Sequence, residues 1–592
     1  MVEFETIIEE VKPLRISRER RFGFLLLLWV AVMGVIMGRS FQLQIIQGRH
    51  WQVRAEENRV AVLPLPAPRG IIYDSHGQQL VENVASTDVV LDPTQLPSEE
   101  YEAPLFDLLP GLTDVTYEDI RNALTAAREH KRVTLLAAAV PHDDVIGIES
   151  VIERLPGVHL TSSSVRKYLY NDSLSHVLGY TGLADENELT QRQDLLLSDM
   201  TGKGGVEKQY DSRLRGRHGA SYTEVDVAGR FQRYIKEEAP VPGEDLYLTI
   251  DADLQQFIYN LLDDGARSGA VVVLEPDTGA VKALVSYPAF DPNVFSRPGR
   301  PDEMQNILEQ PAQPLFNRAI SGTYAPGSTI KPLIAVAGLE EGIISRQTTI
   351  LSTGGIRVGQ WFFPDWKAGG HGATNVTRAL AESINTFFYL LTGGDGTRTG
   401  LGVKRTIDWL GAFSWGQTTG IDLPGETDGL LPSPEWKERT KGERWYIGDT
   451  YHLGIGQGDV LVTPLQVAVA TAALANWGTI YEPQLVTGAG KPQGRRLPVT
   501  RQHLETVREG MRAAVQEGSA RSLNALAIDV AGKTGTAQVG NDDDTHAWFT
   551  SFAPYNEPGL VVTVLLERGG KGDIDAVPIA EEIWRWWADR ED

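Results

Sequence analysis

The sequence predicts an α+β fold behind a single N-terminal transmembrane helix. Residues 22–38 form an uncharged, mostly apolar run, at the short end of the ~17 to 25 residues that cross a bilayer. In the second half of the chain, β-rich runs lie at 270–286 and again at 527–567, with helical patterns between them. Strands on both sides of a set of helices predict one sheet that is assembled from both ends of a domain's sequence.

The composition excludes several classes of function. The chain has 592 residues, enough for several domains and a large core. Its 55 Lys and Arg against 78 Asp and Glu give a net charge of −23. We therefore expect no nucleic acid partner, because binding phosphates requires a basic face. The absence of cysteine excludes disulfides, thiolate zinc sites and cysteine nucleophiles.

The charges beside the apolar run predict its orientation. Arg15, Arg18, Arg20 and Arg21 precede it, whereas only Arg39 follows closely. Because positive residues favour the cytoplasmic side, we expect a cytoplasmic tail at 1–21, a transmembrane helix at 22–42 and the rest of the chain outside. A cleaved signal peptide is the competing interpretation. It is less favoured because no small-residue cleavage site follows, and the amphipathic residues 41–46 continue the helix.

Residues 43–245 are predicted to form a non-catalytic pedestal. The segment is rich in turns, starts with prolines at 64, 66 and 68, and contains acidic helical stretches at 118–128 and 143–154. It has no repeat of fixed period and no constellation of acid and base residues. Residues 240–244 are the expected linker to the next domain.

Residues 246–592 are predicted to form the catalytic domain. A strand at 246–250 and a helix at 251–264 precede a hairpin, whose turn is at 275–279. A long helical and loop section follows, including a stretch at 379–391. The predicted late strands are 527–539, 546–553 and 560–567, and an amphipathic helix at 579–589 closes the domain.

The first candidate catalytic motif is Ser328 with Lys331. Pro326 and Gly327 break the preceding structure, and the apolar run 333–339 indicates a buried helix, so Ser328 is expected on its first turn. The positive end of that helix favours negative charge beside the serine, and Lys331 lies on the same face. A desolvated Lys331 amine loses its proton easily and can take the proton of Ser328. Taken alone, an N-cap serine and a surface lysine explain the motif equally well.

Two further motifs follow at residues 383–385 and 533–536. Ser383 and Asn385 stand between two helical stretches, where a helix cap is the ordinary explanation. Lys533 follows an apolar run, as in a glycine-containing edge strand. A phosphate loop is excluded because Ala527 stands where that loop requires glycine. In the order S-x-x-K, S-x-N, K-T-G, the three motifs together indicate acyl transfer by a serine enzyme.

Acyl transfer at an amide needs an activated hydroxyl, a stabilised oxyanion and a proton for the leaving amine. Ser328 is the predicted nucleophile and Lys331 its base. Ser383 is expected to relay the proton, and Asn385 to hold a substrate amide. Lys533 keeps the site electropositive, while the Thr534 and Thr536 hydroxyls bind a substrate carboxylate. Gly535 lets a peptide pair with the strand edge, and the N–H groups of Ser328 and Thr536 are the predicted oxyanion hole.

With these motifs in place, the chain resembles the class B penicillin-binding proteins, most closely the penicillin-binding protein 2 group of the elongation type. Residues 68–74 match the class B signature that follows the membrane span, although Ser75 and His76 depart from it. Further matching blocks lie at 204–210, 214–216, 315–319 and 420–437, and from Trp445 to the stretch 463–466. The resemblance extends over nearly the whole chain.

The resemblance implies a pedestal of the dimerisation type and a penicilloyl-serine-transferase fold, which is an antiparallel sheet flanked by helices with an all-helical lobe. It implies a peptidoglycan D,D-transpeptidase of cell-wall elongation, anchored in the bacterial cytoplasmic membrane and acylated at Ser328 by D-alanyl-D-alanine donors and by penicillin. The implied partners are peptidoglycan stem peptides, β-lactams and a SEDS-type glycosyltransferase, with no cofactor.

Some relatives of this type carry a zinc site built from aspartate, histidine and cysteine. Asp365 and His371 lie in a matching stretch, 364–372. Because the chain has no cysteine, the set is incomplete, and we expect no tightly bound metal.

Two other functions stay open at this stage. The motifs build an acyl-enzyme but leave its fate to the acceptor, so a D,D-carboxypeptidase or β-lactamase uses the same residues. A non-catalytic receptor for β-lactams is the third interpretation, although such receptors need a cytoplasmic output domain larger than the expected tail. The sequence leaves open the choice between elongation and division, the acceptor diamino acid, and regulation by the membrane partner.

Overall fold

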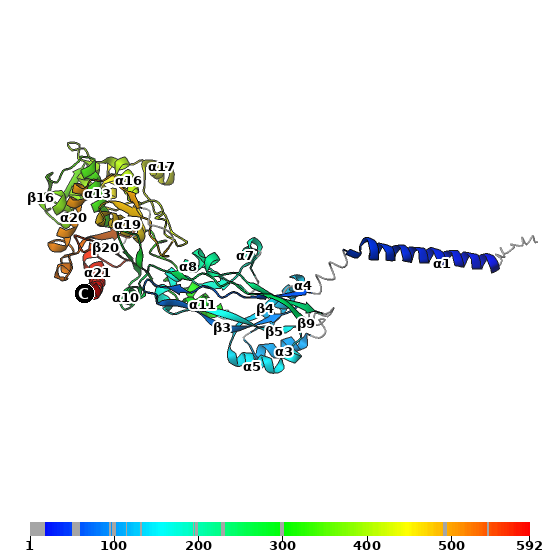
Figure 1. The fold of residues 1–592 in the computed structure, drawn as a ribbon. Helices are drawn as coiled ribbons and strands as arrows, with labels where there is room; N and C mark the ends of the chain where they lie inside the picture. The colour runs from blue at the N-terminus through cyan, green and yellow to red at the C-terminus, as the bar shows by residue number, and fades with distance from the viewer. Residues whose placement is uncertain are drawn as a thin grey trace, which may run out of the picture. The chain divides into compact units, whose positions relative to one another are not determined.

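The computed structural model describes residues 18–49, 60–93, 96, 102–113, 115–130, 133–192, 194–195, 199–225, 231–296, 301–488, 494–540 and 544–591. The chain divides into two compact units (Figure 1). The first consists of Met1–Leu65 with His218–Pro240, and the second of Pro66–Arg217 with Val241–Asp592.

The first unit combines the apolar helix with a small sheet. Helix α1 spans Arg18–Phe41 and continues as a π-helical turn over Gln42–Ile46. Among the described residues, the stretch Phe22–Ile46 alone is long and apolar enough to cross a membrane, which confirms the predicted apolar helix; residues 1–17 of the predicted tail lie outside the described residues. Strands β1 (Val60–Leu65), β8 (Gly219–Val225) and β9 (Phe231–Glu238) form an antiparallel sheet in that order.

The second unit begins with a five-stranded sheet. Its order is β10 (Leu246–Tyr247), β2 (Ile72–Tyr73), β3 (Gln79–Leu91) and β4 (Thr134–Val140), with β5 (Val158–Tyr168) also paired to β3. Helices α3 (Ala103–Leu108), α4 (Tyr117–His130) and α5 (His142–Val151) pack with β3, β4 and β5 around a separate apolar core. Shorter elements follow: α6 (Ser175–Leu178), β6 (Thr181–Leu183), α7 (Glu186–Gln191), β7 (Met200–Gly202), α8 (Gly205–Gln209) and α9 (Asp211–Leu214).

A buried ionic cluster joins two of the sequence blocks noted above. Arg69 Nε lies 2.7 Å from Glu207 Oε2, and Arg69 Nη1 lies 2.8 Å from Asp211 Oδ1. Arg166 Nε, from β5, lies 2.7 Å from Glu207 Oε1. Burial alone raises the pKa of Glu207, but the charges of Arg166 and Arg69 hold it below its ordinary value. The cluster therefore stabilises α8 and α9 against the strands.

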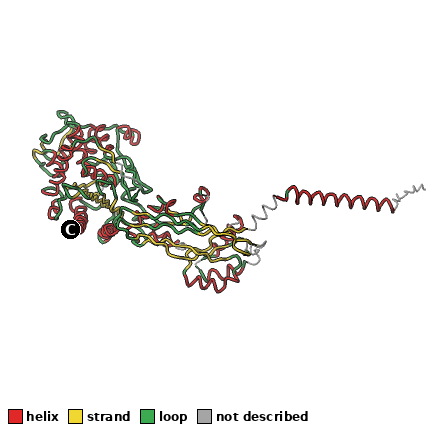
Figure 2. Tube along the Cα trace, in the orientation of Figure 1, coloured by secondary structure: helices red, strands yellow, loops and turns green. Residues whose placement is uncertain are grey.

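The sheet of the catalytic half has the order β12 (Val281–Tyr287), β11 (Gly269–Leu274), β21 (Leu560–Leu566), β20 (Thr545–Ala553), β19 (Ala531–Gln538), with every neighbouring pair antiparallel. Figure 2 draws the strands of the structure in yellow. The prediction of a sheet built from both ends of the domain is confirmed. Because strand side chains alternate between faces, Val271 and Val273 pack with α10 (Ala252–Asp263) and α21 (Val577–Glu591). Ala270 and Val272 pack into the core of the helical lobe.

Most of the remaining elements form that lobe and its small hairpins. Its helices are α13 (Lys331–Glu340), α14 (Val376–Ala381), α15 (Asn385–Gly393), α16 (Gly402–Ala412), α17 (Pro434–Lys441), α18 (Ile447–Gly454), α19 (Pro464–Ala475) and α20 (Arg501–Gln516). Helix α11 (Pro292–Ser296) packs instead against β5 and β6, with α12 (Pro301–Leu308) beside it. The short strands pair as β13 (Ile350–Ser352) with β16 (Gly372–Thr374), β14 (Gly355–Val358) with β15 (Trp361–Pro364), and β17 (Thr479–Tyr481) with β18 (Gly494–Arg496).

Three predicted elements have different bounds in the structure. The strand expected at 246–250 is limited to β10, which pairs in parallel with β2. The strand expected at 527–539 begins only at Ala531, after a 3-10 turn over Arg521–Ala525 and a bend at 526–528. The helical stretch at 379–391 is divided into α14 and α15, because Ser383 adopts a left-handed φ of 54°, which an α-helix does not contain.

Candidate active site

Three segments that are distant in the sequence meet at the candidate active site. They are the 3-10 turn η6 (Gly327–Ile330) that opens α13, the turn between α14 and α15, and strand β19 at the edge of the sheet. Turn η6 packs against β19. The structure thus brings together three motifs that are separated by up to 205 residues in the sequence (533 − 328).

The nucleophile motif lies on a turn that contacts strand β19 and the segment around Gly456. Gly327 has a φ of +52°, and a Cβ atom built on it would lie 2.8 Å from Thr536 O. Gly327 N donates to Gly456 O at 2.9 Å. Ser328 is half-buried and lies on this 3-10 turn. The α-helix itself starts at Lys331, so Ser328 precedes the first α-helical turn on which we expected it.

Lys331 is completely buried, and its amine contacts the second motif. Nζ donates to Ser383 O at 2.8 Å, to Asn385 Oδ1 at 2.7 Å and to Ser383 Oγ at 3.2 Å. Burial lowers the pKa of Lys331 well below its ordinary value, and the charge of Lys533 lowers it further, whereas Asp365 acts in the opposite direction. Within the described part of the chain, Ser328 Oγ is not among the hydrogen-bond partners of this amine.

The second motif occupies a strained turn. Ser383 has a φ of 54°, a conformation that costs a non-glycine residue energy and that concentrates at functional sites. It directs the Ser383 carbonyl and hydroxyl oxygens to within hydrogen-bond distance of Lys331. The sequence motif identified the residue type but not this backbone conformation.

Lys533 is the second buried amine of the site. Burial lowers its pKa to about 7, opposed by the negative charge of Asp573. Its Nζ donates to Thr534 O at 2.9 Å. An amine with a pKa near neutrality exchanges a proton easily in the physiological range.

The residues that follow Lys533 have unequal access to solvent. Thr536 is exposed, and its Oγ1 accepts from Gly572 N at 3.2 Å. Thr534 is buried, and its Oγ1 lies 2.7 Å from Ser519 Oγ. A Cβ atom on Gly535 would lie 2.9 Å from Thr329 Cγ2, so glycine is required there for close packing between β19 and η6.

Sequence reasoning missed two residues beside the motifs. Ser519, which bonds Thr534, follows α20 and belongs to no motif. Gln457 Nε2 donates to Thr536 O at 3.3 Å; it belongs to a block of the family resemblance, which was the only signal available.

Asp365 and His371 do not fit a zinc site. The Asp365 carboxylate accepts from Asn385 N, Ser352 Oγ and the backbone and side chain of Thr386. His371 Nδ1 lies 2.6 Å from Glu382 Oε2, and His371 Nε2 is buried with no hydrogen-bond partner in the described part of the chain. Among the described residues, no three His, Cys, Asp or Glu side chains are grouped to hold a metal.

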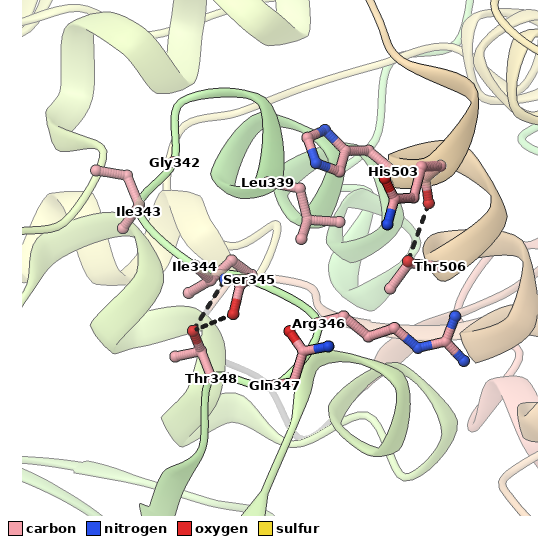
Figure 3. A pocket seen from close by; sticks show the side chains of 11 residues that line it. Leu339, Gly342, Ile343, Ile344, Ser345, Arg346, Gln347, Thr348, His503 and Thr506 are labelled. Atoms are coloured by element: carbon pink, nitrogen blue, oxygen red, sulfur yellow. Dashed lines mark hydrogen bonds between the residues drawn. The ribbon is translucent and has the colours of Figure 1, made fainter.

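The pocket of Figure 3 is separate from these motifs. It has a volume of about 420 Å³ and lies where α13 ends and α20 begins, lined by Leu339, Gly342, Ile343, Ile344, Ser345, Arg346, Gln347, Thr348, Gln502, His503 and Thr506. Ser328 is at the opposite end of α13, so none of the predicted site residues lines this pocket.

Comparison with known proteins agrees with this geometry. Residues 269–585 match the penicillin binding protein transpeptidase domain, and residues 64–248 match the penicillin-binding protein dimerisation domain. The chain is 33% identical to the peptidoglycan D,D-transpeptidase MrdA of Acinetobacter baumannii, over 97% of this chain and 88% of the relative.

Two solved structures have the same fold. The penicillin-binding protein PBP2 of Helicobacter pylori, in complex with MreC, matches with a TM-score of 0.79 and 27% identity over 90% of this chain and 99% of that one. A peptidoglycan synthase complex, described as coordinating polymerization and crosslinking, matches with a TM-score of 0.71 and 30% identity over 96% and 98%. The chain therefore belongs to the penicillin-binding protein transpeptidases, as a class B member of the penicillin-binding protein 2 type.

Proposed function

We propose that this enzyme cross-links peptidoglycan stem peptides during elongation through an acyl-enzyme on Ser328. The observation that carries the proposal is the buried Lys331 amine, whose lowered pKa favours the neutral base and which lies within hydrogen-bond distance of Ser383 Oγ. Asn385 and Lys533 complete the set of functional groups around it.

Ser328 Oγ attacks the carbonyl carbon of the penultimate D-alanine, and its proton passes to the neutral Lys331 amine. Ser383 relays a proton to the nitrogen of the terminal D-alanine, which leaves as the C–N bond breaks. The amine of a second stem peptide then attacks the ester carbon, gives up a proton along the same path and restores the Ser328 hydroxyl. Three acceptors surround Lys331 Nζ, so accepting a proton completes its hydrogen bonds.

We place the donor peptide along the open edge of β19. Among the strands that the structure describes, β19 is paired on one side, with β20, so its outer edge can accept a peptide as an added strand. The exposed Thr536 hydroxyl binds the terminal carboxylate in this scheme, near the positive charge of Lys533. The Thr534 hydroxyl, which is hydrogen-bonded to Ser519 Oγ, binds the same carboxylate together with Ser519 in this scheme. Backbone N–H groups of Ser328 and Thr536 stabilise the oxyanion, which the close contact of Gly327 with Thr536 supports.

The domain organisation follows from the same proposal. Residues 22–42 anchor the chain in the bacterial cytoplasmic membrane, with residues 1–21 in the cytoplasm. Residues 43–245 form the non-catalytic pedestal and residues 246–592 the transpeptidase domain outside. A SEDS-type glycosyltransferase that supplies the glycan is the proposed membrane partner; the similarity to a peptidoglycan synthase complex supports such a pairing.

Covalent labelling with a fluorescent penicillin tests the nucleophile. The detergent-solubilised full chain is expected to label, and Ser328→Ala is expected to lose the label. Ser321→Ala is the matched control, because Ser321 lies seven residues earlier, outside the motif, and its hydroxyl donates to Gly425 O at 2.7 Å. Equal labelling of Ser328→Ala and the wild type would remove Ser328 from this role.

Product analysis with stem peptides then tests the fate of the acyl group. Cross-linked dimers are expected when an acceptor amine is supplied. Release of free D-alanine with no dimer under the same conditions contradicts transpeptidation and identifies water as the acceptor.

A further inference from the structure

The turn that carries Ser383 and Asn385 is not held in place by its own side chains. Helix α15 starts at Asn385, and the preceding N-cap residue, Ile384, has no polar side chain with which to cap it. The first backbone N–H groups of a helix have no intrahelical partner. A turn that also contains the strained Ser383 backbone needs a partner from elsewhere to keep one conformation.

Asp365, twenty residues earlier, supplies that partner. Its Oδ1 accepts from Asn385 N at 2.6 Å, and its Oδ2 accepts from Thr386 N at 3.3 Å and Thr386 Oγ1 at 2.5 Å. The carboxylate thus caps α15 from a distant segment, just after β15. Hydrogen bonds from an ionised carboxylate to backbone N–H groups are stronger than neutral ones.

A second layer fixes the carboxylate itself. Ser352 Oγ, from β13, donates to Asp365 Oδ2 at 2.7 Å and accepts from His371 N at 3.2 Å. Asp365 N donates to Gly354 O at 2.9 Å. Asp365 is only 7% exposed, so water does not compete effectively for these bonds.

We infer that Asp365 is a positioning residue, which holds Asn385 and Ser383 in the orientation that receives the Lys331 amine. The path is short: Asp365 bonds Asn385 N, and the Asn385 side chain accepts from Lys331 Nζ at 2.7 Å. Asp365 touches neither the substrate nor Ser328 in this scheme. The inference rests on the proposed function, because it assigns a role in the acylation step.

The charge of Asp365 adds a second effect on the same amine. The groups that act on the Lys331 charge are Lys533 from β19, which lowers its pKa, and Asp365, which raises it. The uncharged neighbours are Ser383, Asn385 and the ring of Phe388, whose centroid lies 5.3 Å from Nζ. Removing the Asp365 charge therefore leaves more of the amine neutral at low pH.

The test measures acylation by a fluorescent penicillin as a function of pH in the detergent-solubilised full chain. Asp365→Ala removes the cap and the charge, and it is expected to lower the acylation rate about 10²-fold, the size of effect that follows from misplacing catalytic groups. Asp365→Asn keeps the shape but not the charge. It is expected to stay within about tenfold of the wild-type rate at the plateau, and to move the acidic limb of the profile to lower pH.

Asp251→Asn is the matched control. Asp251 caps α10 through Leu254 N at 3.0 Å and belongs to no catalytic motif, so both the rate and the pH limb are expected to match the wild type. An unmoved acidic limb in Asp365→Asn, or wild-type acylation in Asp365→Ala, overturns the inference. Asp365→Asn decides the question if Asp365→Ala does not fold. Failure of the wild type itself to be acylated at Ser328 contradicts the proposed function instead.

Discussion

Replacing Gly327 by alanine is expected to damage both the stability of the catalytic domain and its acylation. Gly327 has a φ of +52°, and the added Cβ would lie 2.8 Å from Thr536 O, 3.0 Å from Thr536 C and 3.1 Å from Thr536 N. All three atoms belong to the backbone of β19, which is held in the sheet by β20. The new methyl group can be accommodated only if turn η6 and strand β19 move apart.

Two costs add in this variant. A left-handed conformation costs a non-glycine residue about 1–2 kcal/mol, and forcing an extra methyl group into a packed site costs about 1–3 kcal/mol. The expected loss in the free energy of unfolding is thus about 2–5 kcal/mol. Acylation should also slow, because the displaced segments carry Ser328 and Thr536, whose N–H groups form the proposed oxyanion hole.

Gly342→Ala separates the two costs. Gly342 follows the other end of α13 and has a φ of +65°, but a Cβ atom there meets nothing within 4 Å. It is expected to lose only the conformational part, about 1–2 kcal/mol, and to keep wild-type acylation. The measurements are chemical denaturation of the solubilised full chain and the rate of labelling by fluorescent penicillin. If Gly327→Ala is no less stable than Gly342→Ala and is acylated at the same rate, the reasoning from the close contact is wrong.

Two further predictions concern buried charges. Glu207→Gln leaves Arg69 and Arg166 without their shared carboxylate and is expected to cost about 3–5 kcal/mol of unfolding free energy. The control, Lys404→Ala, breaks an exposed ion pair with Asp408 and should cost about 0.5 kcal/mol or less. Equal losses of unfolding free energy in chemical denaturation would contradict the role of the cluster. Folding lowers the pKa of Lys533 to about 7. Between this pH and the ordinary pKa of lysine, the amine is protonated in the unfolded chain and largely neutral in the folded one. Lys533 therefore makes the folded protein more stable as the pH rises through this range. The thermal midpoint should rise less between pH 7 and 9 in Lys533→Met than in the wild type, and an identical rise in both proteins contradicts the lowered pKa.

Much of the proposed catalytic residue set could be predicted from the sequence because its members belong to short local motifs. Ser328 with Lys331, and Lys533 with its glycine and threonines, are neighbours along the chain. Hydrophobic and β-branched runs at the two ends of the domain predicted one sheet assembled from both ends, whereas the position of β19 at its edge comes from the structure. Asp365 is the contrasting case: it was noted only for a metal site, whereas in the structure its oxygens accept hydrogen bonds from the start of α15.

The sequence by itself determined the apolar helix near the N-terminus, the α+β class and the residue types of the three motifs, because each depends on periodicity or on the order of nearby residues. Only the tertiary structure decided how those residues meet. The Lys331 amine bonds Ser383 and Asn385 across more than fifty positions (383 − 331 = 52), and Thr534 bonds a serine of another segment. Burial of two amines beside each other, which lowers the pKa of Lys331 and of Lys533, depends on contacts between distant segments that no local pattern encodes.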